Sequence, residues 1–564
     1  MDYKKKDIYG FKITMAYKIL FISFFVTFSS SQLFAQDWDN NTPELDDARV
    51  VIEKDRKIEL PAASRNYEKV PPLPDDSEEK TLEYSFEDYN FSLQPLDPKI
   101  RVLTIQEEKL NKFYGNYVKA GFGNYLTPYL EGFFNNKRND RYAIGAHVKH
   151  LSSRNGPVDD ENSGSSENLV GLYGKLFTKP LTFTGDLRYK RNKVYYYGYA
   201  PGLEVDRNDI EHIYNSFNVE AGIQSNSSNE DLYYKMDASL NYLADNFEAK
   251  ESQLGFNFEG RYRLSEILEI GLESDLYLTK LEDNGSVNRN LFRLTPTFTT
   301  VFEPIEITAG INVVYENDSL ANANKVHFYP KARATYHITD EIKIYGGIDG
   351  DLNRTSLQYF ADENLFLNQN VQVFNTNKTL EFYGALEGKV FKMLSFKGGF
   401  SIGNYKNMYY FVNSATDSSR FDIVYEDGNT SLVNFFGEIG ISKSEVFNLV
   451  FRTDFYSYGT DTLKEAWHKP NFGLSLLGSY NIYDKILLSA QLAALGGIEG
   501  YNAQSERSKS LDTILDLGLK AEYMFSERAS AFLSFNNILG NDNERFLYYP
   551  SRSLMVMAGV TYSF

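Results

Sequence analysis

The sequence contains no cysteine among its 564 residues, and this absence removes several classes of protein. A disulfide framework, thiolate catalysis and a lipid attached to an N-terminal cysteine all require that residue. Downstream of the N-terminus there is no apolar run of about 18 residues or more, which excludes membrane-spanning helices. Past about residue 114 almost no segment has the period of an amphipathic helix.

A period of two runs through the chain instead and is clearest between Leu254 and Lys280. One parity carries large apolar residues such as Phe256 and Leu272, and the other carries mainly polar and charged residues. Because successive side chains of a strand point to opposite faces, each half of this stretch predicts a strand with one apolar face and one polar face. The short Ser265-Glu266 step between the halves predicts a hairpin turn.

The hairpin pattern recurs to the last residue, with short turns alternating with long polar loops. A closed β-barrel satisfies every backbone group in a membrane and needs only alternate residues to be apolar. We therefore predict an all-β fold in which residues 114–564 form a transmembrane antiparallel up-and-down β-barrel of about 22 strands, within a range of 18 to 22. Short turns should face the periplasm and long loops the outside.

The polar parity should then line the lumen of the barrel, where charged side chains pair across strands and remain hydrated. Six residues of the Leu254 to Lys280 stretch are predicted to face the lumen: Glu259, Arg261, Arg263, Glu269, Glu273 and Asp275.

The N-terminal part of the chain has the features of an exported protein. Lys18 precedes the apolar run Ile19 to Phe28, and a small-residue cleavage site ends at Ala35, so residues 1–35 are predicted to be a signal peptide. Residues 37–113 contain 19 acidic and 11 basic residues, a net charge of −8, and 7 of the 16 prolines. Such composition resists packing into a core, so residues 36–113 are predicted to be an extended acidic periplasmic segment. Together with the barrel, this predicts a location in the outer membrane.

The last strand is the most specific local feature. The stretch from Phe535 to Phe564 contains Tyr549-Pro550-Ser551-Arg552 and ends on Gly559-Val560-x-Tyr562-x-Phe564. It is similar to the closing hairpin of TonB-dependent receptor barrels, and the resemblance is specific only over these last residues. It implies a terminal signal, including Tyr562 and Phe564, by which the outer-membrane assembly machinery recognises the chain.

The resemblance covers the barrel part of that family and no more. Receptors of the family carry a plug domain ahead of the barrel, longer than the acidic segment of this chain and rich in glycine motifs. Residues 36–113 do not match such a plug. An unfilled barrel of this size would have a wide lumen, so we expect the lumen to be open or filled by loops, by this segment or by a partner.

Aromatic clusters lie next to or within three of the long loops, and two interpretations fit them. They could form an interfacial girdle between lipid tails and water. The alternative is that they stack on a sugar or siderophore, because planar rings cover the apolar faces of such ligands. The candidate stacking residues are Tyr195, Tyr197, Tyr199, Tyr409, Tyr410, Tyr548 and Tyr549.

No pattern in the sequence indicates an enzyme. There is no G-x-S-x-G elbow, and His147 and His150 would lie on opposite faces of a strand, so we predict no catalytic residue, metal site or cofactor. The predicted function is a channel or receptor for uptake of small solutes. The alternative is a structural or assembly component that docks a periplasmic protein or surface lipoprotein. The lipid bilayer is the expected environment, and no nucleic-acid partner is expected.

Overall fold

The computed structural model describes residues 114–226, 231–283, 285–318 and 325–564. All of them belong to the second of two compact units of the chain, Gln106–Phe564. The predicted signal peptide and acidic segment lie outside the described residues. Within the described residues, no helix is long and apolar enough to cross a membrane.

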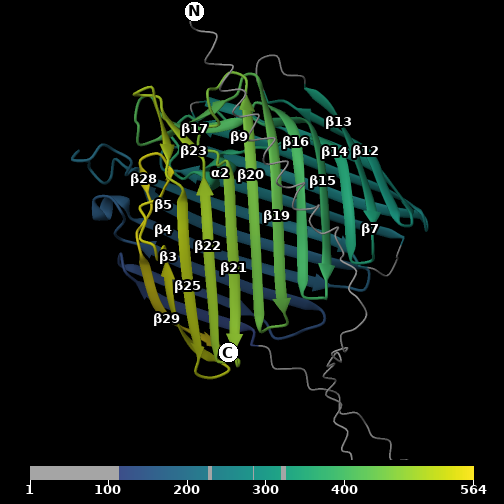
Figure 1. Ribbon diagram of the computed structural model, residues 1–564, viewed down its shortest axis with the longest axis horizontal. Coiled ribbons are helices and arrows are strands. Elements are labelled where there is room, and N and C mark those ends of the chain that lie inside the picture. The colour runs from purple at the N-terminus through teal and green to yellow at the C-terminus, as the bar shows by residue number, and fades with distance from the viewer. Residues whose placement is uncertain (1–113, 227–230, 284, 319–324) are drawn as a thin grey trace, which may run out of the picture. The chain divides into compact units, whose positions relative to one another are not determined.

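Twenty-two strands form a closed antiparallel barrel, which confirms the predicted fold and strand number (Figure 1). The first strand, β1, pairs with both β2 and the last strand, β29, and so closes the sheet. The barrel sheet contains one further short strand, β10 (Gly285–Asn288), which pairs with the end of β9 and is not counted as a strand of the wall. The barrel strands are β1 (Asn116–Gly123), β2 (Thr127–Asn135), β3 (Tyr142–Ser153), β4 (Ser165–Phe177), β5 (Leu181–Tyr195), β6 (Glu211–Ser225), β7 (Leu232–Asp245), β8 (Lys250–Ser265), β9 (Leu268–Asp283), β11 (Leu291–Phe302), β12 (Ile305–Glu316), β13 (Val326–His337), β14 (Ile342–Asn353), β15 (Thr376–Val390), β16 (Leu394–Lys406), β19 (Asn429–Lys443), β20 (Phe447–Thr460), β21 (Phe472–Ile482), β22 (Ile486–Gly496), β25 (Ile514–Met524), β26 (Ala529–Asn536) and β29 (Met555–Ser563).

The two ends of the barrel differ in the length of their connections. At one end, here called the short-turn end, connections such as Glu266-Ile267 and Glu303-Pro304 are a few residues long. At the other, here called the long-loop end, most connections are long, and 124–126 and 246–249 are the short exceptions. The predicted hairpin is present, since Gly260 pairs with Leu272 and Tyr262 with Ile270 in the β8–β9 register.

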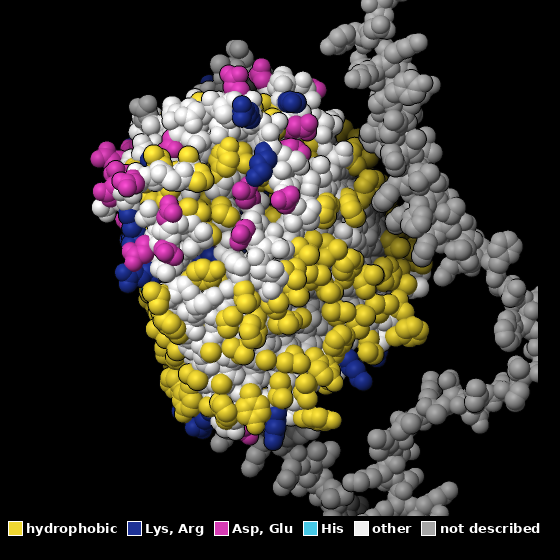
Figure 2. Space-filling model, turned by 60° about the vertical axis from the view of Figure 1, so that its left-hand side comes forward, with side chains coloured by type: hydrophobic (Ala, Val, Ile, Leu, Met, Phe, Trp, Pro, Cys, Tyr) yellow, Lys and Arg dark blue, Asp and Glu magenta, His cyan; other side chains and the backbone are white. Residues whose placement is uncertain are grey.

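The two faces of the barrel wall follow the parity predicted from the sequence. Phe256, Tyr262 and Leu272 are exposed on the outside. Figure 2 shows such apolar side chains gathered over the lower part of the barrel, with acidic and basic side chains concentrated toward the long-loop end. An outward apolar surface of this kind matches lipid-facing barrels.

The long loops contain secondary structure that the sequence did not indicate. One contains the 3-10 turn η1 (Asp160–Ser163) and another the short helix α2 (Leu357–Glu363). The remaining pieces are β17 (Tyr409–Asn413), β18 (Phe421–Tyr425), β23 (Ile498–Asn502), β24 (Arg507–Leu511), β27 (Glu544–Phe546) and β28 (Tyr549–Pro550). Four of them form a second sheet in the order β18-β17-β23-β24, so these loops are folded against one another rather than extended.

Candidate functional site

The long loops of the second half of the chain fold together at the long-loop end. We call this assembly the loop cap and define it as residues 354–375, 407–428, 461–471, 497–513 and 537–554. Its elements α2, β17 and β23 cluster toward the long-loop end in Figure 1. Because each of these loops returns to the strand next to the one it left, the cap adds no strand to the barrel wall.

An apolar core joins the cap to the inner wall. Phe360 of α2, Phe411 of β17 and Phe421 of β18 are each at most 1% exposed. They share one buried cluster with wall residues of β6, β7 and β9. The wall members are Tyr214, Leu243 and Leu281, and the last loop contributes Phe546 and Tyr549. Burying several large apolar groups at about 1.5–3 kcal/mol each favours a packed cap over loops extended into water.

Helix α2 is held by one ion pair to the barrel wall and one to a neighbouring loop of the cap. Its N-cap is Ser356, whose side chain accepts a hydrogen bond from the backbone N–H of Tyr359. On one wall, Lys190 of β5 lies 3.2 Å from Asp362. Within the cap, Lys469 of the loop after β20 lies 3.0 Å from Glu363. The short helix is therefore tied both to the wall at β5 and to the cap loop that follows β20.

A buried histidine connects three loops of the cap. His468 is 1% exposed, and its Nδ1 lies 2.7 Å from the carbonyl oxygen of Phe411. Its Nε2 accepts a hydrogen bond of 3.2 Å from the backbone N–H of Leu547. This pattern requires a neutral ring with the proton on Nδ1. Burial and, to a smaller extent, the nearby cations Arg545 and Lys469 lower the pKa of His468 to about 4.

The cap is expected to lose stability when the pH falls. Below pH 6.5 the unfolded His468 binds a proton while the folded ring stays neutral until about pH 4. The unfolded state therefore binds more protons in this window, and stability falls by about 1.4 kcal/mol per pH unit, about 3 kcal/mol in total. Above pH 6.5 His468 makes no difference. Urea unfolding followed by fluorescence of the buried Trp467, in a Trp38→Phe background, measures this slope.

The matched control for this prediction is His468→Gln. Glutamine retains a donor and an acceptor but does not titrate, so its cap should show a flatter dependence between pH 6.5 and pH 4. Equal slopes in both proteins would show that other groups cause the effect.

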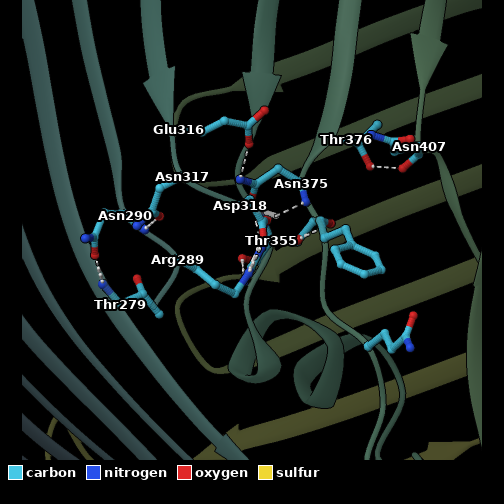
Figure 3. Close-up of polar contacts among 12 residues, drawn as sticks. Thr279, Arg289, Asn290, Glu316, Asn317, Asp318, Thr355, Asn375, Thr376 and Asn407 are labelled. Atoms are coloured by element: carbon cyan, nitrogen blue, oxygen red, sulfur yellow. Dashed lines mark hydrogen bonds and ion pairs between the residues drawn. The ribbon is translucent and has the colours of Figure 1, made fainter. Parts of the chain in front are cut away.

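A buried ion pair joins the rim of the barrel to the cap (Figure 3). Arg289 and Asp318 lie 2.6 Å apart with side chains that are 4% and 5% exposed. The guanidinium of Arg289 also donates to the carbonyl oxygen of Thr355 and to the side-chain oxygen of Asn375. Thr355 lies near the start of the α2 loop and Asn375 at its end. Asn375 in turn donates to Glu316. The arginine thus fastens both ends of the α2 loop to the two neighbouring loops.

The charged side chains predicted to face the lumen lie on the wall face opposite the exposed apolar one. Glu273 on β9 contacts Lys331 on β13 at 3.1 Å, although β9 and β13 are not neighbours, and such contacts require the concave face. Asp275 lies 2.7 Å from Arg293. The remaining four residues share this parity: Arg261 lies 3.4 Å from Glu259, and Arg263 is opposite Glu269 in the register. Their role in solute passage stays a prediction.

The candidate stacking aromatics are mostly packed inside protein. Tyr195, Tyr410 and Tyr549 are 2%, 0% and 3% exposed, and Tyr409 is also buried. The girdle interpretation is wrong for these four rings, because loops rather than lipid cover them. Ligand stacking stays a prediction. If the loops do not move, a ligand could stack only on the less buried members of the set, which are Tyr197, Tyr199 and Tyr548.

The residues of the predicted assembly signal lie at the seam of the barrel. Tyr562 and Phe564 are 48% and 47% exposed, and their rings stack with centroids 5.8 Å apart. The strand that contains Tyr562 is paired on both edges, with β1 and β26. Recognition by assembly machinery stays a prediction.

The residues that hold the cap were not found from the sequence. Arg289, Lys469 and Glu251 contact residues between 29 and 107 positions away along the chain. No periodic pattern encodes such contacts, and the sole local sign is a histidine, His468, within a polar loop. Within the described residues, no group of three or more possible ligands could hold a metal ion.

Comparison with solved structures places the fold among iron and siderophore receptors. No protein-family model and no curated protein matches the chain. The FrpB iron transporter from Neisseria meningitidis aligns with a TM-score of 0.62 and 8% identity, over 81% of this chain and 82% of that one. The siderophore receptor PirA from Acinetobacter baumannii gives 0.59 and 11% over 81% of each chain. The ferric-catecholate import receptor Fiu from Escherichia coli K12 gives 0.59 and 10%, over 80% of this chain and 82% of that one. At such low identity the likeness establishes a shared fold: the barrel of this chain is similar to the barrels of these proteins.

Proposed function

We propose that the chain is an outer-membrane barrel that takes up small solutes through its lumen and is closed at rest by the loop cap. The observation that carries this proposal is the packing of α2 and its loop against the inner wall, through the buried cluster that contains Tyr214, Leu243 and Leu281 and the ion pair to Lys190. The names of the structural neighbours, which are receptors and transporters, support the same function class.

The ion pair that joins α2 to the barrel wall is weak enough to open. The Lys190 and Asp362 side chains are 31% and 53% exposed, so their ion pair contributes about 0–1 kcal/mol and breaks easily. Below the cap the inner wall is polar and partly exposed, as the Lys331 and Glu273 side chains are, at 35% and 54%. A hydrated polar wall admits water-soluble molecules once the cap has moved.

Shortening the cap tests this proposal. Asn353 and Thr376 are direct partners in the β14–β15 register, so a four-residue Gly-Ser linker can replace residues 354–375 without disturbing the barrel. In planar bilayers the wild-type chain should be closed for most of the time. The shortened variant should show large and stable conductance, because α2 and its share of the core are gone.

The matched control replaces residues 154–164 in the same way, between the register partners Ser153 and Ser165. That loop contributes no residue to the main buried core of the cap, so its variant should remain closed. A correctly folded shortened variant that stays silent would overturn the proposal. Silence combined with a stoichiometric partner that is lost on deleting residues 37–100 would favour the structural or assembly role.

A further inference from the structure

A polar cavity of about 240 Å³ lies between α2 and the inner wall. Its wall side is built on a ladder of side-chain hydrogen bonds that crosses four adjacent strands. Asn218 donates to Asn241 at 2.6 Å, Asn241 to Gln253 at 3.3 Å, and Gln253 to the hydroxyl of Thr279 at 3.0 Å. Each pair is directly opposite in the strand register, so the ladder is a rigid polar surface.

The other side of the cavity comes from the cap. Arg354, Ser356, Gln358, Tyr359 and Asp362 line it, and the last two are exposed, so the cavity opens to the lumen. The cavity is smaller than the about 300–1,000 Å³ typical of sites for drug-sized ligands, and it therefore suits a molecule of monosaccharide size.

Most charges of the cavity already have partners. Glu251, 4% exposed, accepts hydrogen bonds from the backbone N–H groups of Leu357 and Gln358 at 2.9 and 3.3 Å. Asp362 is paired with Lys190 at 3.2 Å. Both acids are thus committed to holding α2.

The guanidinium of Arg354 is different. It lies over the ring of Tyr277, 4.2 Å from the ring centroid. Across the described parts of the chain, no group forms a hydrogen bond or an ion pair with it, although the carboxylate of Glu251 is close enough to attract it electrostatically. Its planar fork of N–H donors matches the two oxygens of a carboxylate. A partly buried cation that stacks on a ring and keeps its donors free is positioned for an anionic group of a ligand.

We infer that this cavity binds a small hydroxylated carboxylate, such as a sugar acid, with the carboxylate on Arg354 and the hydroxyl groups on the amide ladder. Amide side chains donate and accept, and therefore suit hydroxyl groups, which do both. A neutral sugar would leave the guanidinium unpaired. This inference rests on the proposed function, because it names the solute class that the lumen would admit.

Titration calorimetry of the full chain in detergent micelles, with D-glucuronate and D-glucose as probes, tests the inference. D-Glucuronate should bind at least about tenfold more tightly than D-glucose, since a charge-assisted bidentate contact is worth about a factor of ten or more. Arg354→Gln should remove this preference. Arg354→Lys, which keeps the charge but not the fork, should retain part of it.

Arg333→Gln is the matched control. Arg333 also lies over a tyrosine ring, 4.0 Å from the centroid of Tyr345, but it does not line the cavity, so its variant should bind like wild type. Fluorescence of Trp467 checks that the cap of each variant is folded. If the cap of Arg354→Gln is not folded, the binding preference of Arg354→Lys tests the inference instead. Equal binding of the two probes, no binding of either, or equal losses in the Arg354 and Arg333 variants would overturn the inference. The cap-shortened variant lacks Arg354, so its conductance tests the proposed function without testing the binding of a carboxylate. The two proposals can therefore fail separately.

Discussion

Replacing Arg289 with alanine is expected to lower the stability of the cap by about 3–5 kcal/mol. The side chains of Arg289 and Asp318 are almost fully buried, so removing the cation leaves a carboxylate without its partner in a site that water does not reach. The change also removes the donors to Thr355 and Asn375 (Figure 3). The loop that contains α2 then loses its attachment at both ends.

Hydrogen exchange measured on the peptide covering residues 354–375 follows this loss directly. The peptide should exchange faster in the variant, while peptides from the barrel strands should stay protected. Arg154→Ala is the matched control, because Arg154 and Glu161 form an ion pair with side chains that are 63% and 41% exposed. Such a pair contributes at most about 1 kcal/mol. Similar exchange in the two variants would contradict a central role for Arg289.

Lys469→Met is expected to destabilise the cap by about 2–4 kcal/mol, somewhat less than Arg289→Ala because Glu363 is 25% exposed. Burial lowers the pKa of Lys469, and the carboxylate of Glu363 opposes that shift. Lys469 also lies 4.0 Å from the centroid of the Tyr409 ring, and the hydroxyl of Tyr409 donates to Glu363. Methionine fills a similar volume but removes the cation that contacts the acid, which leaves Glu363 with the electrostatic attraction of Arg545 alone.

The double variant Lys469→Met, Glu363→Gln separates charge from packing. It removes both charges while an amide oxygen remains to accept from Tyr409, so it should recover much of the lost stability. Urea unfolding followed by Trp467 fluorescence measures the three proteins. A double variant as unstable as the single one would show that packing, not the unpaired acid, causes the loss. Lys190→Met should cost at most about 1 kcal/mol, because its ion pair is half-exposed.

The barrel wall could be predicted from the sequence because the alternation of apolar and polar residues along each strand is local and periodic. Alternation around Phe256 and Leu272 gives the two faces, and turns such as Ser265-Glu266 and Glu303-Pro304 give the hairpins. Each strand pairs mainly with the next one along the chain, so counting turns also counts strands.

The cap could not be predicted because its contacts join distant segments with no shared period. The hydroxyl of Tyr196 donates to the carbonyl oxygen of Leu367, 171 residues away, and that of Tyr549 to Ser419. In the sequence these tyrosines look the same as rings at a lipid interface. Composition alone does not distinguish a ring covered by other loops from one covered by lipid, which is why the girdle interpretation failed.

The last loop of the chain supplies Phe546 and Tyr549 to the buried cluster that also contains Tyr214 from β6. The buried core of the cap is therefore complete only when the final hairpin is in place. A chain cut short before residue 546 would lack both this part of the cap and β29, the strand that closes the barrel onto β1.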